Sequence, residues 1–153
     1  RGDVVNFIPP QYAGPLAART GLIAGEEHWC PISAREFESV YHPGIHVIGD
    51  AAQADAMPKS AYAANVQAQF CAMNVVARLN GHNPQDFVAL NACYAAIGPD
   101  EAISITGAYR AAGRQFQAIP ESGTRSPADL SWARREHLHA ESWLRNMLAE
   151  LRE

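Results

Sequence analysis

A charge-poor stretch in the middle of the chain most constrains its fold. In the segment Ala51–Pro99 only four residues are charged: Asp55, Lys59, Arg78 and Asp86. Ser60 is a suitable N-cap and Gly81 suits the position after a helix, so we expect a helix from Ser60 to about Asn80. A helix without a charged face is usually buried on several sides. We therefore expect part of its cover to come from polypeptide outside this chain or from a partner.

The composition limits the function classes. The 153 residues are 48% hydrophobic and 18% charged, which is typical of a globular protein. The 16 acidic residues outnumber the 12 basic ones, and this balance argues against nucleic acid as a partner. No run of about 18 apolar residues is present, so we expect no membrane span. Lys59 is the only lysine beside 11 arginines, an oddity that only its neighbours can explain.

The first part of the chain has the pattern of an α/β segment. Asp3–Ile8 is predicted to be a short buried strand that Pro9 stops. Ile45–Ile48 is an apolar run between glycines and is predicted to be a buried central strand. His28–Ile32 should be extended, because a residue before proline avoids the α region. A short helical turn is expected near Leu16–Arg19.

The pattern changes after residue 83. Three short runs predict an antiparallel meander: Asn91–Ile97, Ala102–Tyr109 and Gln115–Ile119. A long terminal helix should begin at Asp129 or Ser131 and end near Leu151. Its apolar stripe is predicted to contain Leu130, Ala133, His137, Ala140, Leu144, Met147 and Leu151. The predicted fold class is α/β plus α+β, with residues 1–83 in one domain and residues 84–153 in a small α+β interface domain.

Several catalytic motifs are absent. The glycines form neither GxGxxG nor a Walker loop, and there is no GxSxG or HExxH. Three cysteines are too few and too widely spaced for a disulfide scaffold or a CxxC metal site. His137 and His139 lie two residues apart on different helix faces, so we expect no shared metal there.

The informative segment follows the predicted central strand. Gly49-Asp50 at a strand end can place a carboxylate where ligands bind in α/β proteins, and Asp50 could then accept hydrogen bonds from sugar-like hydroxyls. The alternative is an ordinary turn aspartate. Pro58-Lys59-Ser60 leads into the helix, whose N-terminal amides would favour an anionic group such as the pyrimidine edge of a reduced flavin.

These residues carry a family resemblance. Gly44–Ala51 with Pro58-Lys59-Ser60 resembles the second flavin-binding motif of the pyridine-nucleotide disulfide reductase superfamily. A fuller set of segments resembles the C-terminal part of the flavoprotein subunits of flavocytochrome c sulfide dehydrogenases. They are Val4-Val5-Asn6, Ile8-Pro9-Pro10-Gln11, Ala13-Gly14, Trp29-Cys30-Pro31, Phe37-Glu38-Ser39 and Asn91-Ala92-Cys93-Tyr94. The similarity extends over nearly the whole chain and is weakest after Ser126.

The resemblance implies the C-terminal portion of a flavoprotein with two dinucleotide-binding domains. Such a protein uses FAD, oxidises sulfide in the periplasm and passes electrons to a c-type cytochrome subunit. Cys30 matches one half of the redox-active disulfide over the flavin. Asp50 matches the residue that holds the ribityl chain, and Lys59-Ser60 approach the ring. Gly49 and Pro58 complete the expected cofactor-binding set.

The chain also departs from this family. The GxGxxG fold for the ADP moiety, the cysteine that attaches the flavin and the disulfide partner of Cys30 belong to an N-terminal half that these 153 residues do not contain. Cys71 and Cys93 are expected to be packed thiols. We therefore expect the chain alone to bind FAD weakly or not at all, and to show no turnover.

Two other interpretations stay open. A sulfide:quinone oxidoreductase would use an amphipathic C-terminal segment at a membrane surface, but the last helix has a mixed-charge face that suggests solvent. A non-catalytic module would dock residues 83–153 onto a partner protein, with Trp132 and Trp143 either as interface anchors or as core residues against the meander. A homo-oligomer would be a further way to cover the apolar faces.

Overall fold

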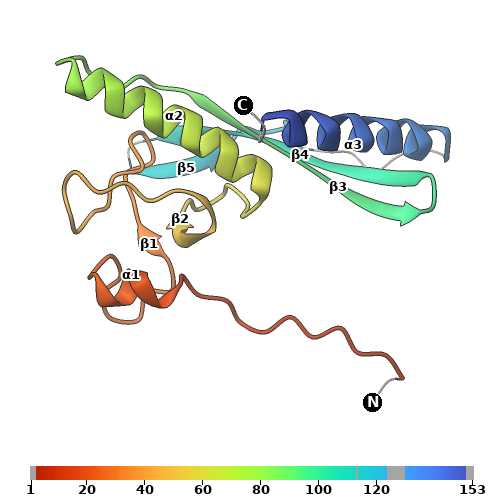
Figure 1. The fold of residues 1–153 in the computed structure, drawn as a ribbon, viewed down its shortest axis with the longest axis horizontal. Coiled ribbons are helices and arrows are strands. Elements are labelled where there is room, and N and C mark those ends of the chain that lie inside the picture. Colours follow the sequence, from red (N-terminus) through yellow and green to blue (C-terminus); the bar gives the residue numbers. More distant parts are fainter. Residues whose placement is uncertain (1–2, 113, 124–129, 151–153) are drawn as a thin grey trace.

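The computed structural model describes residues 3–112, 114–123 and 130–150 and shows a mixed α/β fold (Figure 1). Its first half contains α1 (Pro15–Arg19), β1 (Cys30–Pro31), the 3-10 turn η1 (Gly49–Ala51), β2 (Ala52–Gln53) and the long helix α2 (Ala61–Leu79). Its second half contains β3 (Val88–Gly98), β4 (Glu101–Ala112), β5 (Gln115–Ala118) and α3 (Leu130–Glu150). The predicted antiparallel meander and the terminal helix are confirmed, whereas the described residues do not form the larger dinucleotide-binding fold.

The predicted strand over Asp3–Ile8 is wrong. The segment is an arm that runs away from the rest of the molecule (Figure 1), and it pairs with no strand in the described part of the chain. Val4 is 93% exposed, and Val5, Phe7 and Ile8 are exposed as well. A strand needs a neighbour that pairs with its N–H and C=O groups, and an apolar run alone does not supply one.

The predicted central strand over Ile45–Ile48 is also wrong. Ile45 and Ile48 are exposed, and the segment makes only an isolated antiparallel bridge within the described residues. Its backbone pairs instead with the preceding turn, where the Val47 N–H donates to the Phe37 carbonyl at 2.8 Å. The parallel partner of Cys30 is Ala52 of β2. The extended conformation expected around Cys30 is therefore confirmed.

Helix α2 begins and ends where the sequence predicts. The Ser60 hydroxyl accepts a hydrogen bond from the Ala63 N–H at 3.0 Å, and Gly81 after the helix has a φ of +75°. The helix is not buried on several sides, because Met73, Val76 and Leu79 on its second half are exposed. The described part of the chain therefore leaves one apolar face of α2 open.

Two buried amides on α2 hold irregular backbone in place. The Gly49 N–H donates to Gln67 Oε1 at 2.7 Å. Asn74 Nδ2 donates to the Arg35 carbonyl at 2.8 Å, and Asn74 Oδ1 accepts from the Gln85 N–H at 2.9 Å. Buried backbone groups in loops need such partners. The amides thus explain how a single helix can support the long irregular region before it.

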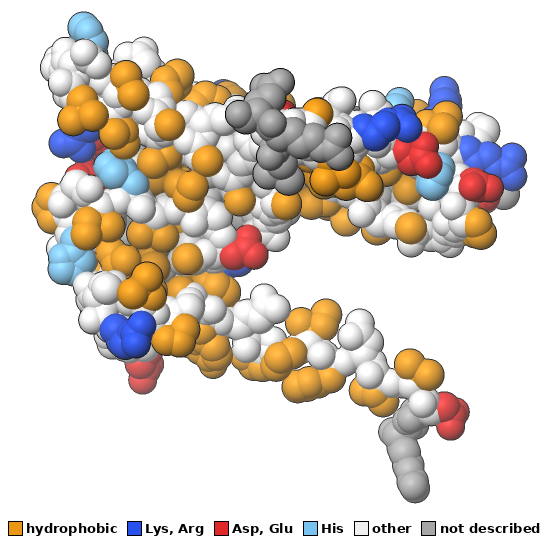
Figure 2. Space-filling model, viewed as in Figure 1, with side chains coloured by type: hydrophobic (Ala, Val, Ile, Leu, Met, Phe, Trp, Pro, Cys, Tyr) orange, Lys and Arg blue, Asp and Glu red, His pale blue; other side chains and the backbone are white. Residues whose placement is uncertain are grey.

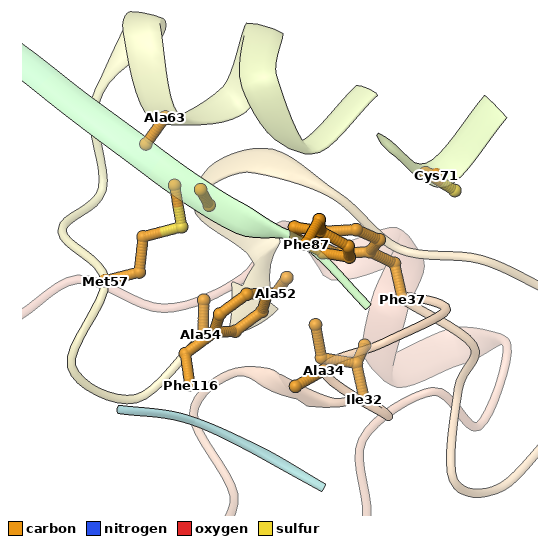
Figure 3. Packing of buried hydrophobic residues seen from close by; sticks show 11 residues of the cluster. Ile32, Ala34, Phe37, Ala52, Ala54, Met57, Ala63, Cys71, Phe87 and Phe116 are labelled. Atoms are coloured by element: carbon orange, nitrogen blue, oxygen red, sulfur yellow. The ribbon is translucent and has the colours of Figure 1, made fainter. Parts of the chain in front are cut away.

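The hydrophobic core lies between α2, the loops before it and the base of the sheet (Figure 3). The Phe87 ring stacks on Phe70, with 4.1 Å between ring centroids, and Phe37 and Phe116 approach it at 5.8 and 6.0 Å. Residues from both sides of position 83 build this core. The division into residues 1–83 and 84–153 stays a prediction.

Helix α3 packs along the β3–β4 hairpin (Figure 1). Ala133 is buried as predicted, but Leu144 is exposed, and the Trp143 ring faces Tyr94 at 6.0 Å between centroids. His137, Ala140 and Met147 of the predicted stripe are half-buried, so the stripe is correct except at Leu144, where the neighbouring Trp143 packs against the sheet instead. Asp129, Leu151 and the side chain of Leu130 lie outside the described residues.

Candidate functional site

Cys30 is the first residue of β1, the short strand that pairs with β2. Its side chain is 1% exposed, and the strand register places Cys30 opposite Ala52. Burial raises the pKa of the Cys30 thiol, whereas the positive charge of Lys59 acts to lower this pKa. Cys30 is a free thiol in the structure, as are Cys71 and Cys93.

Lys59 is hydrogen-bonded to the backbone of η1 and of the start of β2. Its Nζ donates to the Asp50 carbonyl at 2.7 Å and to the Ala52 carbonyl at 2.8 Å. The same ammonium lies 3.8 Å from the centre of the Trp29 ring, a cation–π geometry. Partial burial lowers the pKa of Lys59, while Asp50 and Cys30 act to raise it. Lys59 thus brings a positive charge next to β1 and β2 while much of its side chain stays exposed.

Gly49 and Asp50 form the turn that precedes β2. Gly49 has a φ of +68°, which favours glycine, and a Cβ at this position would come within 3.4 Å of Ala64 Cβ on α2. The turn therefore lies close against the helix. The Asp50 side chain is exposed, where it can accept hydrogen bonds from a ligand, although Asp50 does not lie at the end of a buried strand as predicted.

Pro58 and Ser60 bring the chain into α2. At this helix start the amides of Ala61 and Tyr62 have no intrahelical acceptor, as at the first turn of any helix. The positive end of the helix dipole lies at the same place. The predicted residues Asp50, Lys59 and Ser60 are thus gathered around the start of α2. Lys59 also bonds to Ala52, the residue that pairs with Cys30.

A hollow of about 480 Å³ lies beside this group. It is lined by Glu27, His28, Trp29, Gln53, Ala54, Asp55, Met57 and Lys59. Of the predicted site residues only Lys59 lines it. The sequence analysis names Trp29 only as part of the Trp29-Cys30-Pro31 segment that resembles the family. Its contact with Lys59 was not predicted, because the two residues are 30 positions apart and no local signal links them.

The donor set fits one part of a flavin. The amides at the start of α2 suit the oxygens of a pyrimidine edge, the Lys59 ammonium adds a positive charge beside them, and the Asp50 carboxylate suits ribityl hydroxyls. The described residues present no GxGxxG turn for a pyrophosphate. They also gather no trio of His, Cys, Asp or Glu side chains suited to a metal ion. Within the described ranges, no helix has the apolar length needed to cross a bilayer.

A comparison with known protein families finds a match in the second half of the chain. Residues 85–151, less than half of the chain, match the family described as "Flavocytochrome c sulphide dehydrogenase, flavin-binding". The match spans the three-stranded sheet and α3, and it leaves Cys30 and Lys59 outside. The match supports the resemblance of this chain to the flavoproteins of flavocytochrome c sulphide dehydrogenase and suggests a flavoprotein role.

Proposed function

We propose that the chain is part of an FAD-dependent sulfide dehydrogenase that passes electrons to a c-type cytochrome. The observation that carries the proposal is the Lys59 ammonium placed next to the buried Cys30 strand, in a chain whose residues 85–151 match this family. The periplasm is the proposed location, because a redox disulfide needs an oxidising compartment.

Each site residue has a proposed role. When bound, FAD supplies a two-electron acceptor. Asp50 binds ribityl hydroxyls, and Gly49 lets the turn lie close to α2. The flavin-facing turn, Pro58–Ser60, presents the helix start and the Lys59 ammonium to the pyrimidine edge. A positive charge at that edge favours the reduced, anionic form over the oxidised form.

Cys30 would act as one sulfur of a disulfide. Hydrosulfide attacks one sulfur of that disulfide, the S–S bond breaks, and the products are a persulfide and a thiolate that carries the electron pair. Lys59 lowers the free energy of a thiolate at Cys30, because its charge lies next to this residue. The second cysteine would come from outside this chain, since Cys30, Cys71 and Cys93 are all unpaired.

The decisive experiment is the visible spectrum of the protein isolated with its flavin. The proposal predicts flavin absorbance that sulfide bleaches, followed by reduction of added cytochrome c. Reduction of a quinone instead would favour a sulfide:quinone oxidoreductase. Absence of any flavin would favour a non-catalytic module that docks onto a partner.

Cys30→Ser in that flavin-loaded protein should abolish sulfide oxidation. The matched control is Cys71→Ser, because Cys71 is, like Cys30, a buried free thiol, and it has no proposed role in the site. Full activity in Cys30→Ser would remove Cys30 from the mechanism. A homo-oligomer would cover the exposed apolar faces, and sedimentation of the same sample measures its formation.

A further inference from the structure

A partly buried hydrogen bond joins the flavin-facing turn to the three-stranded sheet. The Ser60 hydroxyl donates to Asn91 Oδ1 at 2.6 Å, and Asn91 Nδ2 donates to the Ile105 carbonyl at 3.2 Å. Asn91 is 3% exposed and lies on β3 opposite Gly107 of β4. The amide is therefore fixed at both ends, one end on β4 and the other on the residue before α2.

This bond determines which way the Ser60 hydroxyl points. A hydroxyl has one proton and two lone pairs, and without a fixed acceptor it rotates. Because its proton goes to Asn91, a lone pair is left to accept from the Ala63 N–H at 3.0 Å. Asn91 thus fixes the N-cap of α2, and through the cap it fixes the backbone of the turn that carries Lys59.

We infer that Asn91 is a positioning residue, through which the sheet holds the flavin-facing turn. The inference rests on the proposed function for its link to flavin. The family match described as flavin-binding begins at residue 85, whereas Asp50, Lys59 and Ser60 precede it. A role for Asn91 in holding the turn explains how the matched region can contribute to a flavin site that lies outside it. Asn91 lies inside the matched region and contacts Ser60 directly.

The first test needs no flavin. Asn91→Leu and the smaller Asn91→Ala remove the acceptor, and we expect the Ala63 amide to exchange with solvent about tenfold faster in the 153-residue chain. Ser60→Ala should have the same effect and should add nothing to Asn91→Leu, whereas Ser60→Thr should keep slow exchange because threonine also caps helices. Unchanged exchange at Ala63 in folded Asn91→Ala would overturn the inference.

Asn74→Leu is the matched control. Asn74 is another buried amide that joins α2 to loop backbone, at the opposite half of the helix. Its replacement should lower the melting temperature like Asn91→Leu but leave exchange at Ala63 unchanged. Faster exchange at Ala63 in Asn74→Leu to the same extent would show a general loss of stability and would also overturn the inference.

The second test uses the flavin-loaded protein. We expect Asn91→Ala to shift the midpoint potential and the absorbance maximum of the flavin and to weaken its affinity about fivefold, while Asn74→Leu leaves all three as in the wild type. A bound flavin with unchanged spectrum and potential in Asn91→Ala would overturn the inference and leave the proposed function intact. A wild-type protein without flavin would instead overturn the proposed function, and exchange at Ala63 would then decide the role of Asn91.

Discussion

At the scale of single residues, Lys59 and Cys30 act on each other through charge. The Lys59 charge lowers the pKa of the Cys30 thiol, against the larger effect of burial, which raises it. Lys59→Met should therefore move the pH profile of Cys30 modification to higher pH. In a Cys71→Ser, Cys93→Ser background, we expect the rate with methyl methanethiosulfonate at pH 8 to fall about threefold to tenfold.

Lys59→Arg is the control for this experiment. Arginine keeps the positive charge and the ability to stack on Trp29, so the pH profile should stay near that of wild type. A profile that moves equally in Lys59→Met and Lys59→Arg would indicate changed access to Cys30 and not a changed charge.

Cys71 gives a pH dependence of stability. Burial in α2 raises the pKa of its thiol above the ordinary value of 9.0. A raised folded-state pKa stabilises the fold below the unfolded pKa, and this contribution is lost as the pH rises through the folded pKa. The free energy of unfolding of wild type relative to Cys71→Ala should therefore decrease above about pH 9. Urea unfolding of both proteins from pH 7 to pH 10.5 measures it, and a constant difference would contradict the assignment.

At the scale of elements, the turn before β2 depends on a glycine. Gly49→Ala should lower the free energy of unfolding by about 1–2 kcal/mol, because an alanine at a φ of +68° is strained. The added Cβ would touch Ala64 Cβ at 3.4 Å, an ordinary contact, so the strain is the main cost. Urea unfolding measures the loss.

Gly14→Ala controls for the loss of a glycine. Gly14 has a φ of −58°, and a Cβ there would meet no atom within 4 Å. Its effect should stay within about 0.5 kcal/mol. Equal losses for Gly14→Ala and Gly49→Ala would show that unfolded-state entropy, and not the left-handed backbone, explains the result.

The elements that the sequence predicts correctly are those with local signals. Helix α2 has an N-cap at Ser60 and a glycine at position 81, both within one turn of its ends. The meander has its own turns and pairs with itself. Asp3–Ile8 and Ile45–Ile48 have equally apolar patterns, but a strand also requires a partner, and the described residues provide none to complete a sheet.

The candidate site also contains one part that local sequence predicts and one part that it does not. Asp50, Lys59 and Ser60 are close in sequence, so a motif could predict that they lie together. The contacts of Lys59 with Trp29 and of Ser60 with Asn91 join residues 30 and 31 positions apart. Such contacts depend on how the core packs, and a single sequence gives no local sign of them.

At the scale of the whole molecule, apolar surface is left open in two places. The first place is the N-terminal arm, which exposes Val4, Val5, Phe7 and Ile8. The arm extends from the core on the same side of the view as the hairpin with α3 (Figure 2). The second half of α2 exposes Leu79 at 82%. A chain that completed a flavin site with other polypeptide would be expected to present such surfaces. Their extent agrees with the proposal that this chain supplies only part of the site.

The core itself unites the two predicted domains, and this has a measurable consequence. The Phe116 ring on β5 is 2% exposed and approaches Phe37, from the other half of the chain, at 5.6 Å between centroids. Phe116→Ala should therefore lower the free energy of unfolding by about 3–5 kcal/mol. Because the ring packs against both halves, far-UV circular dichroism and tryptophan fluorescence should report one coincident transition before and after the change.

Ile97→Ala is the control for Phe116→Ala. Because Ile97 is exposed near the hairpin turn, its replacement should lower the free energy of unfolding by less than about 1 kcal/mol. Two separate transitions in wild type would show that residues 1–83 and 84–153 unfold independently, and would refute a shared core.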